Sequence, residues 1–360
     1  MRRSALRGCS LRSVAAGCLL AALLAGTSTA GKGAASRPYQ GRLAWVAGGQ
    51  LIAYASQART WTVPGDGSRR RNVGEAFGAT LSPSGRLIGY AGDTGTVGIV
   101  EIAHAGGKVI RRFRLWAGEV AEGYAPPVWS PDERRVIVEI GTTVSVLYRV
   151  DLEGKPHRIS PASAKRDEWS PAWSPDGRRL AFLSCSLDRG VFCNLAVMQP
   201  DGRARRTLLR RIGAPNAPSD PVWSPDGDMI AYTAMFGPER QIGLRTSGRA
   251  VGVYVLGKDG ARLRRVAQTR PVSTDIGGPS PPAWSPDGRR LAFADNRGIS
   301  AVELGTGKRT RLTWKGADFA VGSFAWAPGP RVVFGHGGSI YTVAEGEPPR
   351  RVAGYSGRTH

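Results

Sequence analysis

Short apolar runs alternate with polar turns along this chain from about residue 41 onward. The segment 172–182 shows the pattern most fully: Trp173 follows an apolar residue, then come the turn Ser-Pro-Asp-Gly, two arginines and an apolar run from Leu180. Short apolar runs bounded by turn residues, without long helical periodicity, predict β-strands. Variants of this segment occupy residues 44–54, 80–90, 128–138, 222–232, 283–293 and 325–334. Such recurrence predicts a repeat protein.

Each repeat contains enough chain for four strands. The first strand ends at the Trp position and the second follows the Ser-Pro-Asp-Gly turn; in the best-preserved repeat we expect the other two at 194–199 and 205–209. Pro presets φ at the first central position of the turn, Asp suits the second, and Gly accepts a positive φ. A side chain in place of Gly177 is therefore expected to strain its hairpin.

The positions equivalent to Trp173 indicate the number of repeats. A Trp at the inner strands supplies a flat apolar surface on which one blade can pack against the next. We therefore expect an all-β fold, a seven-bladed β-propeller of four-stranded antiparallel blades over residues 41–353. The alternative is a six-bladed propeller with a closing strand donated by residues 41–75. The seven equivalent positions are Trp45, Leu81, Trp129, Trp173, Trp223, Trp284 and Trp326.

The Trp-Ser-Pro-Asp-Gly units resemble the repeats of the TolB-like β-propeller family, which are related to the WD-type repeat. The resemblance covers residues 41–353, and five of the seven copies keep Ser-Pro. The protein that gives the family its name is periplasmic, has six blades and an added N-terminal α/β domain, and works in the Tol-Pal envelope system. This sequence departs from that plan, since it predicts seven blades and leaves no room for the extra domain. Partners from that system are therefore not carried over.

The N-terminal residues have a different composition. Four arginines precede an apolar run at 14–25 and small residues at 27–30, which predicts a signal peptide over residues 1–30. The apolar run is short for a membrane span, and an uncleaved anchor is the alternative. We expect a linker at 31–40, a C-terminal tail at 354–360, and an exported protein that is periplasmic, cell-envelope-associated or secreted.

Two cysteines, Cys185 and Cys193, lie beyond the predicted signal peptide. An even pair at close spacing in an exported protein favours a local disulfide. The alternative is two unpaired thiols at the edges of a hairpin.

The chain is strongly basic, with a formal net charge of +22. Its arginines cluster in the strands expected to be outermost, where charge protects exposed edges from pairing with other chains. The same arginines could hold anionic envelope polymers or lipid headgroups. Nucleic acid is not expected as a partner of an exported chain, and no aromatic and basic stacking platform is evident.

Catalytic and metal-binding motifs are missing from the sequence. There is no Gly-x-Ser-x-Gly nucleophile elbow. The histidines, at 104, 157, 336 and 360, lie far apart and lack metal-ligand spacing. We therefore expect neither cofactor nor metal and a protein that is not an enzyme; the alternative is a channel-centred enzyme of the lyase or lactonase type.

The recurrent turn aspartates raise a separate question. Calcium needs several oxygens that converge on one point. These aspartates come one to a blade, and turn formation explains them without a metal. They are Asp132, Asp176, Asp226 and Asp287.

Loop length indicates a binding face. The turns after the first and third strands of each blade are short, whereas long connections, including 234–250 and 268–282, belong to the opposite face. Rigid scaffolds commonly present function on such loops, although tolerated insertion explains them equally. We expect a monomer that binds an envelope or extracellular protein partner and acts as a binding or scaffold module. Candidate contacts are Phe236, Arg240, Arg245 and Asp275.

Overall fold

The computed structural model describes the chain mainly between residues 44 and 354. All regular secondary structure among the described residues is β-strand. Residues 38–360 form one compact unit, and the fold below concerns that unit. The described residues are 44–45, 51–56, 59–64, 71–74, 79–93, 97–104, 108–117, 123–124, 126–141, 145–161, 166–186, 192–213, 218–236, 241–242, 245–246, 250–269, 279–295, 298–313, 324–327, 331–336 and 339–354.

The described strands form seven main sheets, six of four strands and one of five, which we number as blades in chain order. Blade one contains β1 (Ala44–Trp45), β2 (Leu51–Ser56), β3 (Arg59–Pro64) and β4 (Arg71–Gly74). Blade two contains β5 (Ala79–Leu81), β6 (Leu87–Asp93), β7 (Val97–His104) and β8 (Val109–Ala117). Blade three contains β9 (Gly123–Tyr124), β10 (Val128–Trp129), β11 (Arg135–Gly141), β12 (Ser145–Asp151) and β13 (Pro156–Arg158).

The remaining blades follow the same plan. Blade four contains β14 (Arg166–Trp173), β15 (Leu180–Ser186), β16 (Phe192–Met198) and β17 (Arg206–Gly213). Blade five contains β18 (Val222–Trp223), β19 (Met229–Phe236), β22 (Ala250–Gly257) and β23 (Arg264–Thr269), with the small hairpin β20 (Gln241–Ile242) and β21 (Arg245–Thr246) inserted. Blade six contains β24 (Ala283–Trp284), β25 (Arg290–Asp295), β26 (Gly298–Glu303) and β27 (Arg309–Arg311). Blade seven contains β28 (Phe324–Trp326), β29 (Arg331–His336), β30 (Ser339–Ala344) and β31 (Arg350–Gly354).

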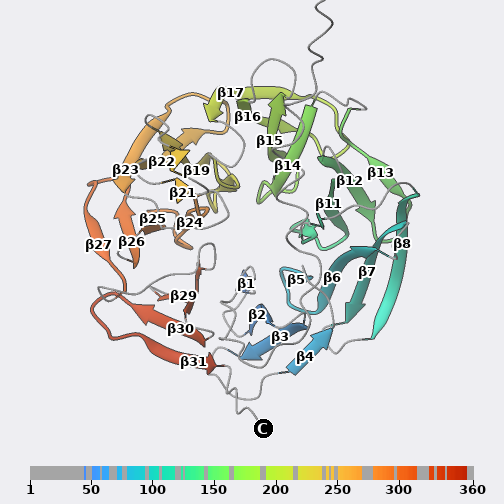
Figure 1. Ribbon diagram of the computed structural model, residues 1–360, viewed down its shortest axis with the longest axis horizontal. Helices are drawn as coiled ribbons and strands as arrows, with labels where there is room; N and C mark the ends of the chain where they lie inside the picture. Colours follow the sequence, from blue (N-terminus) through green and yellow to red (C-terminus); the bar gives the residue numbers. More distant parts are fainter. Residues whose placement is uncertain are drawn as a thin grey trace, which may run out of the picture. The chain divides into compact units, whose positions relative to one another are not determined.

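The blades are arranged as a closed ring of seven (Figure 1). The innermost strands lie against one another in the order β5, β10, β14, β18, β24 and β28, and β28 then lies against β1. Blade one makes contact with blade two through β2 and β5. The prediction of a seven-bladed propeller is thus confirmed. The six-bladed alternative fails because residues 44–74 form a sheet of their own.

The hydrophobic core lies between consecutive blades. Between blades three and four, Ile137 and Leu147 pack with Leu180 and Phe182, and all four side chains are completely buried. Comparable clusters join blades two and three, four and five, five and six, and six and seven. From blade two to blade seven, consecutive blades therefore bury their faces against each other, as expected for a repeat array.

In each of blades three to seven, one Trp connects the blade to the one before it. In each case the indole Nε1 donates to a backbone carbonyl of the preceding innermost strand, next to the equivalent Trp position. The equivalence predicted for these residues therefore has a structural reason, and Trp45 likewise ends an innermost strand, β1. The bonds are Trp129 to Thr80 (3.2 Å), Trp173 to Val128 (3.0 Å), Trp223 to Ala172 (3.1 Å), Trp284 to Val222 (3.1 Å) and Trp326 to Ala283 (2.8 Å).

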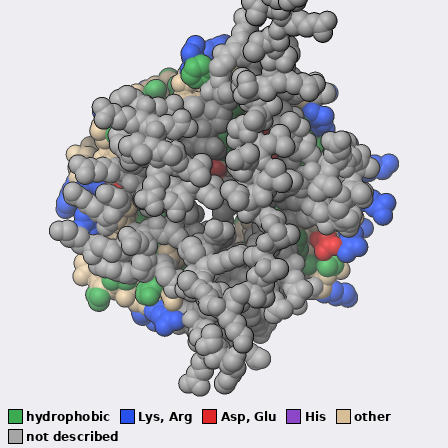
Figure 2. Space-filling view, in the orientation of Figure 1, with side chains coloured by type: hydrophobic (Ala, Val, Ile, Leu, Met, Phe, Trp, Pro, Cys, Tyr) green, Lys and Arg blue, Asp and Glu red, His purple; other side chains and the backbone are tan. Residues whose placement is uncertain are grey.

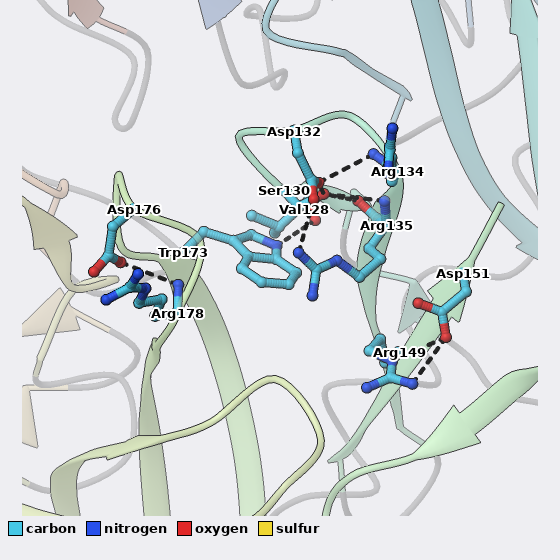
Figure 3. A network of polar contacts seen from close by, with 10 residues as sticks. All are labelled: Val128, Ser130, Asp132, Arg134, Arg135, Arg149, Asp151, Trp173, Asp176 and Arg178. Carbon is cyan, nitrogen blue, oxygen red and sulfur yellow. Dashed lines mark hydrogen bonds and ion pairs between the residues drawn. The ribbon is translucent and has the colours of Figure 1, made fainter.

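The Ser-Pro-Asp-Gly turns follow one hydrogen-bonding scheme. In blade four, the Ser174 hydroxyl donates to Asp176 Oδ1 (2.6 Å) and accepts from the Arg179 backbone N–H (2.9 Å). Asp176 also accepts from the Arg178 backbone N–H (3.0 Å), and Figure 3 shows this turn beside its counterpart in blade three. Gly177 has a φ of 67°, a conformation that favours glycine. The sequence prediction for this glycine is therefore confirmed.

Blade three carries an exception to this scheme. Glu133 takes the position of the glycine at a φ of 58°. Its carboxylate accepts from the hydroxyl of Ser84 (2.8 Å) and from the backbone N–H of the same residue in the turn of blade two. The contact between neighbouring turns offsets part of the cost of the left-handed backbone.

Several sequence expectations concern residues outside the described part. The predicted signal peptide (1–30) and linker (31–40) lie there, as does the predicted C-terminal tail beyond Gly354, which itself ends β31. None of the described residues forms a helix long and apolar enough to span a membrane.

Candidate functional site

The two edges of the ring differ in their connections. At one edge, which we call the turn edge, the strands are joined by segments such as 174–179 and 258–263. At the other, the loop edge, the connections include 214–221, 237–249, 270–282 and 312–323. Neighbouring strands run antiparallel, so connections alternate between the edges. The longest insertions of the chain therefore belong to the loop edge.

The loop-edge end of blade four holds a group of polar side chains on a lengthened innermost strand. Strand β14 spans Arg166–Trp173, whereas the equivalent strand of blade five is only Val222–Trp223. Its register shifts between Trp169 and Ala172, and Ser170 at that bulge has a φ of 54°. Bulges redirect side chains and are common beside functional sites.

Ser170 connects three blades. Its backbone N–H donates to Glu139 Oε2 of blade three (3.0 Å), and its hydroxyl donates to Asp220 Oδ1, just before blade five. Ser170 is buried, with 5% of its surface exposed. Because charge-assisted hydrogen bonds are stronger than neutral ones, this residue links three consecutive blades at the loop edge. We call Glu139, Ser170 and Asp220 the three-blade bridge.

A buried ion pair lies close by in the sequence. The Glu168 side chain is 1% exposed, and its Oε1 pairs with Arg205 Nη2, which belongs to the segment that leads into β17. The guanidinium of Arg205 also lies over the ring of Phe182, 4.6 Å from its centroid. Burial, and secondarily the nearby charge of Arg166, lowers the pKa of Arg205 to about 10. Arg205 therefore remains a cation at neutral pH.

The same arrangement recurs in blade six. Arg309 pairs with Asp295, whose side chain is 3% exposed, and lies 4.8 Å from the centroid of the Phe293 ring. Thr269 of blade five donates to the same carboxylate at 2.9 Å. In both blades an arginine pairs with a buried carboxylate and lies over a Phe ring. The recurrence indicates that this arrangement has a structural role.

Asp167, the residue before Glu168, is a further carboxyl on β14. It accepts from the Ser145 backbone N–H of blade three at 2.6 Å. Burial raises the pKa of this carboxyl, and the hydrogen bonds from Ser145 oppose the shift only in part. Asp167 therefore joins blades three and four at the same end as the three-blade bridge.

Cys185 and Cys193 face each other directly in β15 and β16, and the structure joins them by a disulfide. Both are buried, and the indole of Trp169 lies 3.0 Å from Cys185 Sγ. The bond closes the loop-edge connection 187–191 at its base. The oxidation state of this pair in solution stays a prediction.

The predicted partner contacts are only partly within the described residues. Phe236 is the last residue of β19, and Arg245 begins β21 in the inserted hairpin. Arg240 and Asp275 lie outside the described part. These four residues therefore remain a prediction, and no contact between them is described.

Sequence reasoning missed the three-blade bridge and the buried ion pair. One feature of the sequence does mark the bridge: Trp169-Ser170-Pro171 duplicates the Trp-Ser-Pro of the repeat directly ahead of the true copy at Trp173. The duplicate occupies the bulge of β14. No pattern in the sequence links Glu168 to Arg205, since the contact depends on the tertiary fold.

The turn aspartates are engaged within their own turns. Asp132, Asp226 and Asp287 each accept from the serine two positions earlier, as Asp176 does. Within the described residues no group of three His, Cys, Asp or Glu side chains has the geometry to hold a metal ion.

Seven blades, a closed ring and inter-blade packing define the chain as a β-propeller. No protein-family model matches it. It is 35% identical over 146 residues to the uncharacterized peptidase YuxL of Bacillus subtilis, covering 35% of this chain and 21% of that protein. It is 31% identical over 143 residues to the TolB homolog of Chlorobium luteolum, covering 39% of this chain and 27% of the relative. The chain is a β-propeller with sequence similarity to a TolB homolog, and it spans less than a third of the length of these two relatives.

One further relative and two solved structures are similar to this chain. Uncharacterized protein Atu1656 of Agrobacterium fabrum is 32% identical over 116 residues, 31% of this chain and 39% of that protein. An oligogalacturonate lyase in complex with manganese superimposes with a TM-score of 0.60 at 13% identity, covering 86% of this chain and 89% of the lyase. The Cps50 (Swd1) β-propeller domain of Myceliophteria thermophila gives 0.56 at 14% identity, with 86% and 94% covered. At such identities the structures show a shared fold alone.

Proposed function

We propose that this chain is an exported binding or scaffold propeller of the cell envelope, without catalytic activity of its own, which takes a protein partner on its loop edge at blades four and five. The three-blade bridge carries this proposal. Its hydrogen bonds hold Ser170, Glu139 and Asp220 together at the loop edge. The connections 214–221 and 237–249 belong to the same edge. A rigid base beneath long connections is the usual arrangement of a recognition surface.

The chemistry of the described polar groups supports binding over catalysis. The carboxylates of Glu168, Asp176 and Asp295 are held by neighbouring arginines or by backbone and hydroxyl donors, so they stabilise the blades. Relatives from several strains of Francisella tularensis carry the name Tol-Pal system protein TolB. That likeness supports an envelope location and a protein partner for the present chain.

Replacing residues 237–249 by a short Gly-Ser turn tests the binding surface. The immobilised protein is cross-linked to envelope extract, and its captured partners are identified by mass spectrometry. The matched control carries Arg134→Gln, Arg178→Gln and Arg289→Gln, three exposed positions on the turn edge. We expect the loop replacement to lose a partner that the control and the unmodified protein retain, with equal thermal unfolding of all three. Retention by the loop replacement would contradict the assignment of the binding edge.

A channel-centred enzyme is the competing function. The shared fold with an oligogalacturonate lyase makes oligogalacturonate the first substrate to test. The purified chain is incubated with this substrate, with and without manganese, and products are separated by chromatography. We expect no turnover; products that scale with protein concentration would replace the binding proposal by an enzymatic one.

A further inference from the structure

The outermost strands of the propeller carry charge of one sign. In the described residues the outermost strands are β4, β8, β13, β17, β23, β27 and β31, and each contains at least one Arg and neither Asp nor Glu. The acidic residues of the described strands lie farther in, as Glu101, Glu139, Glu168 and Asp295 do. Basic and acidic side chains are therefore separated between the rim and the inner strands.

Edge protection does not account for this separation. A charged side chain of either sign on an edge strand discourages pairing with another chain. The sequence has 28 acidic residues available for that purpose beside 50 Lys and Arg. Exclusive use of Arg on the rim therefore indicates a second requirement, which an anionic ligand would satisfy.

Many rim arginines are available to such a ligand. Arg206 and Arg210 on β17 and Arg311 on β27 are exposed, and none of the three pairs with an acidic side chain among the described residues. Arg112 and Arg309 differ, since they are bound to Glu101 and Asp295 of their own blades. Figure 2 shows Lys and Arg side chains at several places along the margin of the face in view.

Close contacts join the outer parts of consecutive blades from three to six. The Cβ position of Gly202, in the turn before β17, would lie 2.7 Å from the carbonyl oxygen of Ile159 in blade three. That of Gly260, before β23, would lie 3.1 Å from the carbonyl oxygen of Leu208 on β17. Arg264 on β23 donates to the Leu304 carbonyl of blade six at 3.2 Å. Figure 1 shows these strands in sequence along the outside of the ring.

We propose that the rim of blades three to six is a binding track for a linear polyanion, a flexible polymer with phosphate or carboxylate groups at short intervals. Arginine suits both groups because its planar guanidinium can form two parallel hydrogen bonds to either. The arginines follow the curved outside of the ring over consecutive blades. A flexible chain can follow that curve, whereas a flat membrane meets only a small part of it. The track is separate from the loop edge.

The test compares two variants with the same loss of charge. The rim variant carries Arg206→Gln, Arg210→Gln and Arg311→Gln, and the control is the turn-edge variant Arg134→Gln, Arg178→Gln and Arg289→Gln. Fluorescently labelled long-chain polyphosphate and poly-glutamate are the probes, and anisotropy is measured over a series of salt concentrations. We expect the rim variant to bind at least one probe about tenfold more weakly with a shallower salt dependence, and the control to match the unmodified protein.

Binding of polyphosphate alone, or of poly-glutamate alone, supports the track and identifies the anionic group. Equal weakening by both variants would show a dependence on net charge only and would overturn the proposal. Co-sedimentation with phosphatidylglycerol vesicles, lost in the rim variant while both polymers fail to bind, would assign the rim to a membrane surface instead. The 237–249 replacement should still bind the polymer, which keeps this test independent of the proposed protein-binding function.

Discussion

The indole Nε1 of Trp173 donates a hydrogen bond of 3.0 Å to the backbone carbonyl of Val128 in the preceding blade (Figure 3). Arg135 of that blade lies over the same indole, 5.1 Å from the ring centroid. Blade six repeats the arrangement toward blade seven, where Trp326 donates to Ala283 and Arg290 lies over its ring at 4.9 Å. A single residue type thus supplies apolar area, a directed hydrogen bond and a cation–π contact at the junction between blades.

Replacing Trp173 separates these contributions. Trp173→Phe keeps an aromatic ring but leaves the Val128 carbonyl without its donor, and we expect a loss of about 1 to 2 kcal/mol in the free energy of unfolding. Trp173→Ala removes the ring as well, so we expect a loss of about 3 to 5 kcal/mol. Urea denaturation followed by circular dichroism measures both. Equal losses in the two variants would show that the hydrogen bond contributes nothing separate.

The turn aspartates predict an acid-sensitive component of stability. The serine hydroxyl two residues earlier, followed by a backbone N–H, lowers the pKa of Asp176, Asp226 and Asp287 below the ordinary 3.8. A pKa lowered by folding stabilises the protein above the unfolded value, and this stabilisation is lost as pH falls from 3.8 through the folded value. We expect the urea midpoint to fall over that range, and to fall less in a triple Asp→Asn variant.

Replacing Ser174, Ser224 and Ser285 by Ala provides the mechanistic control for that prediction. It removes the first donor to each aspartate while the carboxylates remain. We expect the acid dependence to flatten in this variant as well. If its dependence is as steep as that of the unmodified protein, the hydroxyls are not the cause of the shift.

The Cys185–Cys193 disulfide makes a chemical prediction. Exported protein alkylated without reductant should keep both cysteines unmodified, and reduction before alkylation should add two labels that mass spectrometry detects. By the loop-entropy relation, replacing both by Ser should lower the free energy of unfolding by about 2 to 3 kcal/mol. Two labels in the absence of reductant would favour the alternative of free thiols.

Replacing one member of the Glu168–Arg205 pair should lower the free energy of unfolding more than replacing both members. Arg205→Met leaves the buried Glu168 carboxylate without its cation, and we expect a loss of about 3 to 5 kcal/mol. Adding Glu168→Gln should recover a large part of that loss, because the uncompensated charge is gone. A double-mutant cycle in urea measures the coupling. Additive losses would show that the two side chains do not stabilise the fold as a pair.

The blades were predictable from sequence because the determinants of a blade are local. The Ser174 hydroxyl, Asp176 and Gly177 form their turn within a few residues, and the same residues recur in other repeats. The expected strand at 194–199 corresponds to β16 at Phe192–Met198. Local hydrogen bonding therefore specifies both the turns and the strand order.

Contacts between distant residues were not predictable in the same way. Ser170 meets Asp220 across 50 positions, and Glu168 meets Arg205 across a strand pair. The extra strand β9 and the β20–β21 hairpin also depart from the repeat, as insertions whose pairing the repeat pattern does not encode. The candidate site consists largely of such departures, so sequence reasoning located its edge but not its residues.

The first and last blades meet with β1 against β28, and among the described residues no strand of one pairs into the sheet of the other. Every blade is complete within its own stretch of sequence. Closure of the propeller therefore does not depend on which blade is synthesised first. A circular permutant whose termini lie between two other blades should fold into the same seven sheets. The seam between blades one and seven is then only the place where covalent continuity is interrupted, and it can be moved around the ring.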